Sequence, residues 1–110
     1  MPAIFTETSV AANTTVGNLV NGSAFEYSRG RQLLSMGVAA AATGTTTAIT
    51  SGADVILEES PTPILTRYPI VPDEMYWNDV MEMFDRLRVQ GRNGTGAAII
   101  MRVAALLQPL

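Results

Sequence analysis

Apolar and polar residues alternate along several stretches of the chain, a pattern typical of strands that bury one face. Threonine and β-branched residues dominate positions 45–50, and Ser51-Gly52 follows as a turn signal. Val55 and Leu57 then share one face of residues 54–59. Runs of β-branched residues on both sides of a glycine turn predict a β-hairpin over residues 45–59.

A second alternating stretch spans residues 85–107, with Leu87 and Val89 on one face before a glycine-rich loop. Beyond the loop, five apolar residues share a face: Ile99, Met101, Val103, Ala105 and Leu107. A three-residue loop over Asn93-Gly94-Thr95 would pair Val89 with Ile99 and keep that face apolar, whereas a one-residue slip would mix the faces. We therefore predict a hairpin in which Gly94 adopts the left-handed conformation.

This hairpin interpretation competes with a second use of the same tripeptide, because Asn93-Gly94-Thr95 also fits an N-glycosylation acceptor. No basic region followed by an apolar core opens the chain, so we expect no signal peptide. We interpret this tripeptide, and the similar ones that begin at Asn13 and Asn21, as turns or loops.

The middle of the chain is harder to assign. Ala and Leu over residues 33–42 are compatible with a helix, but Gly37, Gly44 and the threonines that follow favour a buried strand. Prolines at positions 61, 63, 69 and 72 predict an edge strand or an extended crossover between sheets. For residues 73–87 we favour a short strand at 74–78 followed by a loop to Phe84. A helix remains open there, because several apolar residues have helical spacing.

Residues 1–24 are rich in Thr, Asn, Ser and small residues and show no helical stripe. We interpret them as an extended N-terminal arm with a short strand around Thr15 to Val20, ending at Asn21-Gly22. Residues 25–110 then form one domain of ordinary size. The predicted fold is all-β: an antiparallel β-sandwich or a jelly-roll-like domain with an extended N-terminal arm.

Composition narrows the chemistry more than any motif does. The chain lacks His, Cys and Lys, and all seven basic residues are Arg, so the usual zinc, haem, iron–sulfur and thiol chemistries have no ligands. The adjacent acids Glu58-Glu59 and Asp73-Glu74 point to opposite faces of a strand and make no dyad. Asp73, Glu74 and Asp79 lack calcium-loop spacing. We expect no enzyme, no metal and no cofactor.

Charge and hydropathy also limit the partners. A formal charge of −3 and a pI near 4.7 argue against a nucleic-acid-binding protein. The uncharged stretch 32–53 contains many Ser, Thr and Gly residues, so we expect no membrane-spanning helix. Tyr76 and Trp77 could form a sugar-binding platform, although a lone Trp is more often part of a core.

The polar face of the predicted C-terminal hairpin is unusual, because it combines arginines with apolar residues. Its candidate contact residues are Arg86, Arg88, Ile100, Arg102 and Leu106. Apolar side chains ringed by Arg are typical of protein–protein contacts. The alternative is that a second sheet or the N-terminal arm covers this face.

The order of these segments resembles that of small virion proteins of tailed bacteriophages, the capsid decoration or cement proteins. The resemblance runs through "RGRQLLSMGV", "TTTAITSGADVILEE", "YPIVPDEMYWNDV" and "DRLRVQGRNGTGAA". One departure lies in "EMFDRL", where Phe84 occupies a turn that would normally contain Gly. The resemblance implies a structural protein, made in the host cytoplasm, that sits on the capsid surface as a dimer or trimer and bridges subunits of the major capsid protein.

The resemblance further implies that the arm grips neighbouring subunits, so its apolar residues are interface candidates: Ile4, Phe5, Val16 and Leu19. Two other functions remain open. One is a carbohydrate-binding or adhesin-like module; the other is a self-assembling fibre or scaffold subunit. Neither nucleic acid nor membrane is an expected partner.

Overall fold

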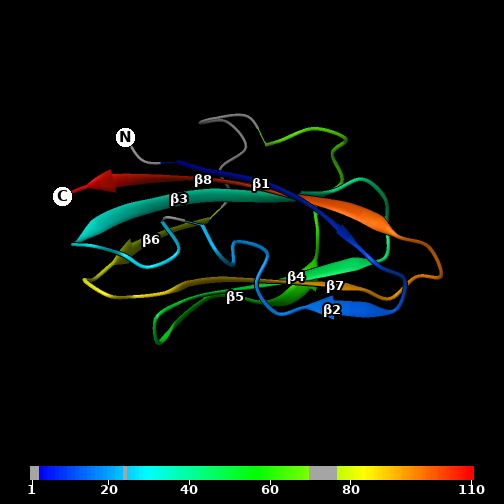
Figure 1. Cartoon of the computed structure of the whole chain (residues 1–110), viewed down its shortest axis with the longest axis horizontal. Helices are drawn as coiled ribbons and strands as arrows, with labels where there is room; N and C mark the ends of the chain where they lie inside the picture. The colour runs from blue at the N-terminus through cyan, green and yellow to red at the C-terminus, as the bar shows by residue number, and fades with distance from the viewer. Residues whose placement is uncertain (1–2, 24, 70–76) are drawn as a thin grey trace.

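The computed structural model describes residues 3–23, 25–69 and 77–110, and they form two four-stranded sheets (Figure 1). Sheet A has the strand order β1 (Ala3–Val10), β8 (Ile99–Pro109), β3 (Gln32–Ala40) and β6 (Trp77–Met81). Sheet B has the order β2 (Thr14–Val16), β7 (Leu87–Asn93), β4 (Thr45–Ser51) and β5 (Asp54–Pro61). The two sheets face each other as a sandwich, so the predicted all-β class is confirmed.

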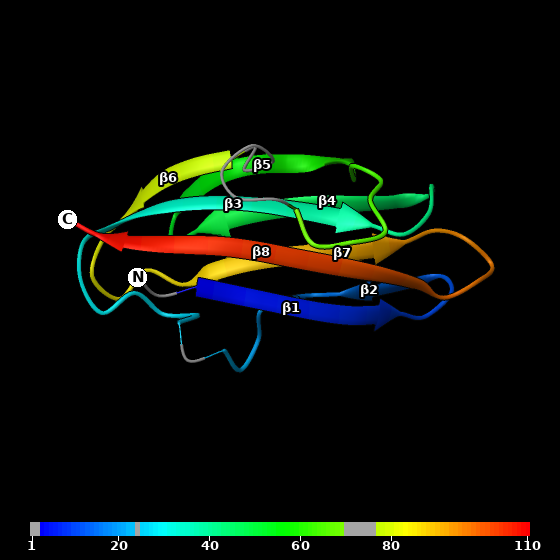
Figure 2. The same ribbon diagram turned by 90° about the horizontal axis from the view of Figure 1, so that it is seen from above.

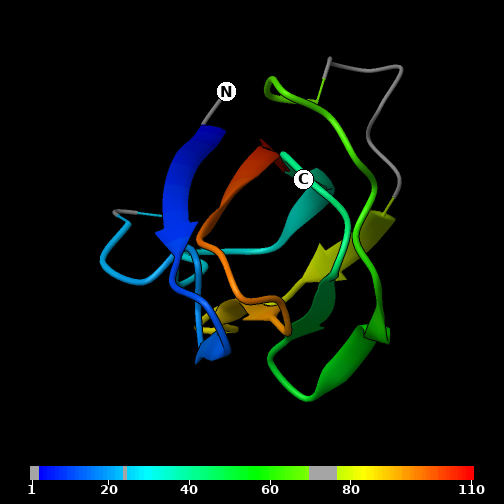
Figure 3. The same ribbon diagram turned by 90° about the vertical axis from the view of Figure 1, so that its right-hand side faces the viewer.

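The strand pairing is that of a jelly roll. β1 pairs with β8, β2 with β7, β3 with β6 and β4 with β5, all antiparallel, as if one long hairpin had been folded double. β8 also pairs with β3, and β7 with β4, which rolls the folded hairpin into two sheets (Figures 2 and 3). Eight strands in this arrangement define the jelly-roll fold.

The core lies between the sheets and follows the predicted alternation. Its largest fully buried side chains come from both sheets and from the loop after β2: Leu34, Met36, Ile49, Met81, Leu87, Met101, Leu107, Val10, Val20, Val38, Val89 and Val103. Sheet B adds small polar residues to its inner face, among them Thr47, whose hydroxyl bonds that of Thr62 at 2.7 Å. Gly91 is also buried. A Cβ at this position would stand 2.8 Å from the Met101 sulfur, so the close packing there favours glycine.

Three local predictions are confirmed. The hairpin over residues 45–59 forms as β4 and β5, with Gly52 in the left-handed region at φ 59°. Residues 32–40 form the buried strand β3. The proline-rich segment leaves edge strand β5 and crosses to sheet A, where Ile64 bridges Ala40.

The predicted hairpin between β7 and β8 is wrong. β7 belongs to sheet B and β8 to sheet A, so the loop between them carries the chain from one sheet to the other. Leu87 and Val89 do share an apolar core with Ile99 and Met101, but they meet it from the opposite sheet. Gly94 is not among the residues with positive φ.

The predicted N-terminal arm is also wrong as a separate unit. All eight residues of β1 pair with β8, from Ala3 opposite Leu106 to Val10 opposite Ile99. β2 forms at Thr14–Val16, slightly before the predicted strand. Ile4, Val10 and Leu19 are buried in the common core, so residues 3–23 are part of the sandwich.

The region assigned as strand plus loop is described from Trp77 onward; most of the strand predicted at 74–78 lies outside the described residues. β6 occupies Trp77–Met81 and a turn follows it, so residues 77–87 contain no helix. In that turn Phe84 has φ 69°, a conformation that disfavours bulky residues. The irregularity noted in the sequence at Phe84 is therefore real. No α-helix that could cross a membrane occurs in the described part of the chain.

Candidate functional site

The structure separates the residues of the predicted contact face. Arg86 and Arg88 belong to the sheet B side of the molecule, next to or on β7, whereas Ile100, Arg102 and Leu106 lie on β8 of sheet A. Because the two strands are in different sheets, these residues do not form one surface.

The outer face of sheet A is partly covered, as the alternative interpretation allowed, but by the proline-rich crossover. Residues 62–69 pass over this face (Figures 1 and 2), and the Tyr68 ring meets Phe5 edge to face at 5.6 Å. Arg102 is mostly buried there, and its Nε donates to Glu7 at 2.8 Å. Of the four candidates from the arm, Ile4 and Leu19 are core residues, Val16 is half-buried, and Phe5 is exposed beside Tyr68.

Two other surfaces stand out. The first lies at the end of the sandwich where the turn 82–86 meets residues 25–31. We call it the Phe84 end surface. Its exposed members are Tyr27, Arg29, Arg31, Glu82, Met83, Phe84 and Leu110, and Arg31 pairs with Glu82 at 3.3 Å. The turn is fixed by backbone hydrogen bonds, since the Phe84 N–H donates to the Ser28 carbonyl and the Ser28 N–H donates to the Asp85 carbonyl, both at 2.8 Å.

A buried carboxylate organises this end. Glu26 is 4% exposed and accepts hydrogen bonds from the Gly22 N–H at 2.9 Å, the Asn18 amide at 3.2 Å and the Arg86 guanidinium. Burial raises the pKa of Glu26, but these three donors outweigh it, so the pKa lies below its ordinary value. Arg86 also lies over the Tyr27 ring, 5.6 Å from its centroid.

Around this anchor the surface is open and combines exposed apolar residues with the Arg31–Glu82 ion pair. Phe84, Met83 and Tyr27 are 78%, 57% and 54% exposed. A hollow of about 350 Å³ adjoins Tyr27 and is lined by Phe25, Tyr27, Arg29, Gly30, Arg31, Gln32 and Pro109. Aromatic residues, Met and Arg are the types that protein interfaces concentrate at their centres.

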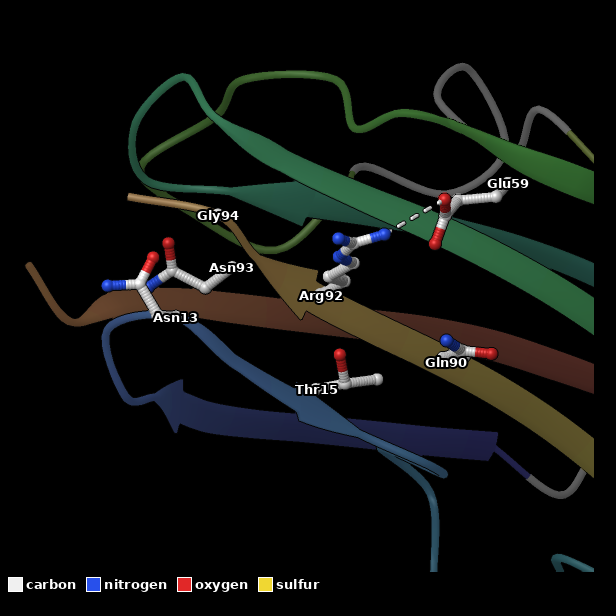
Figure 4. A pocket seen from close by; sticks show the side chains of 7 residues that line it. All are labelled: Asn13, Thr15, Glu59, Gln90, Arg92, Asn93 and Gly94. Atoms are coloured by element: carbon white, nitrogen blue, oxygen red, sulfur yellow. Dashed lines mark ion pairs between the residues drawn. The ribbon is translucent and has the colours of Figure 1, made fainter. Parts of the chain in front are cut away.

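The second surface is the outer face of sheet B (Figure 4). β7 directs Arg88, Gln90 and Arg92 outward, because its alternate residues Leu87, Val89 and Gly91 are buried. A hollow of about 290 Å³ lies here, lined by Asn13, Thr15, Glu59, Gln90, Arg92, Asn93 and Gly94. Arg92 reaches across it to Glu59, with Nη1 3.6 Å from the carboxylate Oε2.

The glycosylation question is answered by the burial of Asn93, which is 1% exposed. Its amide nitrogen donates to the carbonyls of Val10 at 3.0 Å and Ala97 at 2.7 Å. Its amide oxygen accepts from the N–H and the hydroxyl of Thr95. Both amide hydrogens are therefore engaged, and the side chain closes the loop instead of carrying a glycan.

The aromatic platform suggested by the sequence is not available as one surface. Trp77 is half-buried and packs against the core, while Tyr76 lies outside the described residues. Among the residues that the structure describes, no three His, Cys, Asp or Glu side chains come close enough together to hold a metal ion.

Comparisons of the chain with protein-family models, with curated proteins and with solved structures gave no match. The fold and surfaces define the protein by class alone: an eight-stranded jelly roll with one exposed apolar end and one polar sheet face.

Proposed function

We propose that the protein is a non-enzymatic structural protein of a virion, which decorates the outer shell and binds the major capsid protein. The resemblance of its segments to decoration proteins supports this function. The jelly-roll topology supports it by analogy, since viral capsid domains are among the proteins that use this fold, but a fold alone does not define a function.

The observation that carries the proposal is the conformation and exposure of Phe84. A side chain other than Gly in the left-handed region costs roughly 1–2 kcal/mol, and Phe84 is held there at φ 69°. The residue is also 78% exposed, so little apolar burial within the chain offsets this cost. Strained residues of this kind cluster at functional sites.

A decoration protein needs a rigid body and one well-fitted contact. The buried bonds of Glu26 and the backbone bonds of the 82–86 turn fix the backbone at Phe84 before any partner arrives. A preordered backbone loses little freedom on binding, which favours affinity. A ligand that binds the assembled shell, and not its free subunits, stabilises the assembly by mass action.

The test uses virus particles from the source of this gene, purified without the protein, and their dissociated coat subunits. We expect the protein to co-sediment saturably with the particles and not with the free subunits. Phe84→Gly should weaken binding about 30-fold, which corresponds to a hot-spot loss of about 2 kcal/mol. Light scattering of the purified protein should show a dimer or trimer in solution.

A matched control is Val55→Ala. Val55 is another exposed apolar residue, 62% accessible on β5, and its replacement should leave binding unchanged. Absence of binding by the unaltered protein would overturn the proposed function. Equal binding by the Phe84→Gly variant would overturn the assignment of the contact to the Phe84 end surface.

A further inference from the structure

The outer face of sheet B carries a continuous polar track and not a single hollow. The 290 Å³ hollow shares Arg92 and Gly94 with a neighbour lined by Gly44, Thr46, Arg92 and Gly94. It shares Gln90 with another, lined by Ala48, Thr50, Arg88 and Gln90. The three hollows therefore adjoin along β7, whose outward residues recur about every 7 Å.

The track exists because three strands align their small and polar residues. Thr15 of β2 and Thr46 of β4 lie in register on the two sides of Arg92. Ala48 lies opposite Gln90 and Thr50 opposite Arg88 on β4. The β4 residues are short beside the longer Arg88, Gln90 and Arg92 of β7. Figure 4 shows the Arg92 side chain extending from β7 toward Glu59.

The charges at the main hollow are balanced. Arg92 offers donors, and Glu59 offers acceptors 3.6 Å away, so a strong anion would meet the carboxylate and a cation the guanidinium. Gln90 and Asn13 supply both donors and acceptors, and Thr15 supplies a hydroxyl. Neighbouring donors and acceptors of this kind suit a ligand whose groups each donate and accept, which is the property of sugar hydroxyls.

One further feature points to a ligand on this track. No hydrogen bond or ion pair within the described chain holds the Arg88 side chain, which is exposed at the third hollow. An exposed guanidinium without a partner among the described residues is therefore present at one end of the track.

We propose that the outer face of sheet B is a binding site for a neutral, linear oligosaccharide, with Arg92, Glu59 and Gln90 as its central contacts. Lectin domains are among the proteins built on the jelly roll, which is an analogy of fold only. The site is separate from the Phe84 end surface, and it does not depend on the proposed shell binding.

The experiment is an NMR titration of the ¹⁵N-labelled protein with maltotetraose, cellotetraose and chitotetraose. We expect at least one sugar to shift the signals of Thr15, Gln90, Arg92 and Gly94 saturably, with a dissociation constant in the millimolar range. Arg92→Ala should weaken binding at least tenfold. Arg31→Ala, an exposed arginine paired with Glu82 at the other end, is the matched control and should bind normally.

Three outcomes would overturn the sugar site. The first is the absence of saturable shifts with all three sugars. The second is a shift that persists unchanged in the Arg92→Ala variant. The third is saturation of the same residues by sodium sulfate or by oligoglutamate, without any sugar effect, which would assign the track to an anion or an acidic peptide. Phe84→Gly should bind sugar normally, so failure here is distinguishable from failure of shell binding.

Discussion

Replacing Phe84 should reveal a conflict between stability and binding. At φ 69° a Cβ is unfavourable, so the Phe84→Gly variant should be more stable than the Phe84→Ala variant by about 1 kcal/mol. In an ordinary loop the order is reversed, because glycine gives the unfolded chain more freedom. Both variants lack the phenyl ring, so they differ only in the Cβ. The sign of the difference between their free energies of unfolding therefore reports the backbone conformation at position 84.

The comparison with the natural residue follows from exposure. Fully burying a Phe side chain is worth about 3 kcal/mol, and Phe84 is 78% exposed, so losing the ring costs roughly 0.5 kcal/mol. Phe84→Ala should lower the free energy of unfolding by about this amount. Phe84→Gly should raise it by about 0.5 kcal/mol, because relief of the strain exceeds the lost burial.

Urea unfolding measures these differences, with Trp77 as the single tryptophan reporter packed against the core. At an m-value of about 2 kcal/mol per molar, a difference of 1 kcal/mol separates the Gly and Ala midpoints by about 0.5 M. A Gly variant less stable than the Ala variant would refute the strain at Phe84. Phe84 would then not be a strained residue held in place for binding.

Two buried polar groups give the remaining predictions. Glu26→Gln should lower the free energy of unfolding by about 3 kcal/mol, because the Arg86 guanidinium and the Asn18 amide then face a neutral amide instead of a carboxylate. The pKa of Glu26 is lower in the folded state, so its stabilisation is present above the unfolded value of about 4.3 and is lost as pH falls through the folded value. Urea midpoints measured from neutral to acid pH should therefore fall less for Glu26→Gln than for the natural protein; parallel curves would contradict this. Asn93→Ala should cost about 3 kcal/mol, since the carbonyls of Val10 and Ala97 lose their donor. A loss of less than about 1 kcal/mol in the free energy of unfolding, measured by urea unfolding, would show that these bonds contribute little.

Alternation in the sequence predicts which side chains turn inward, but it does not predict which strands are neighbours. Val89 and Ile99 were expected to pair because both belong to an apolar face. They do line one core, yet from opposite sheets, since the inner faces of both sheets of a sandwich contact the same core. The local hairpin β4–β5 was predictable because its turn carries its own signal at Gly52.

The strand pairs that close the jelly roll join residues far apart in the sequence, so no local turn signal predicts them. β1 was interpreted as an arm because its Thr and Ser residues look solvated, whereas its partner β8 lies about 95 residues further along, as in the Glu7–Arg102 pair. Glu26 was missed for the same reason: its partner Arg86 is 60 residues away, and nothing near Glu26 indicates the pair. Phe84, by contrast, could be identified in the sequence because it occupies a turn that would normally contain Gly.

The positions of the two surfaces suggest how both could be used at once. β7 begins next to the turn that carries Phe84 and ends at Asn93, beside the loops of the opposite end (Figure 1). The chain extends 42 Å along its longest axis, and Arg92 lies near the far end of β7 from Phe84. A molecule docked through its Phe84 end surface would therefore direct the Arg92 hollow away from the contact. Shell binding and sugar binding should be independent, with the affinity for sugar unchanged on the particle; competition between the two would place both partners on the same surface.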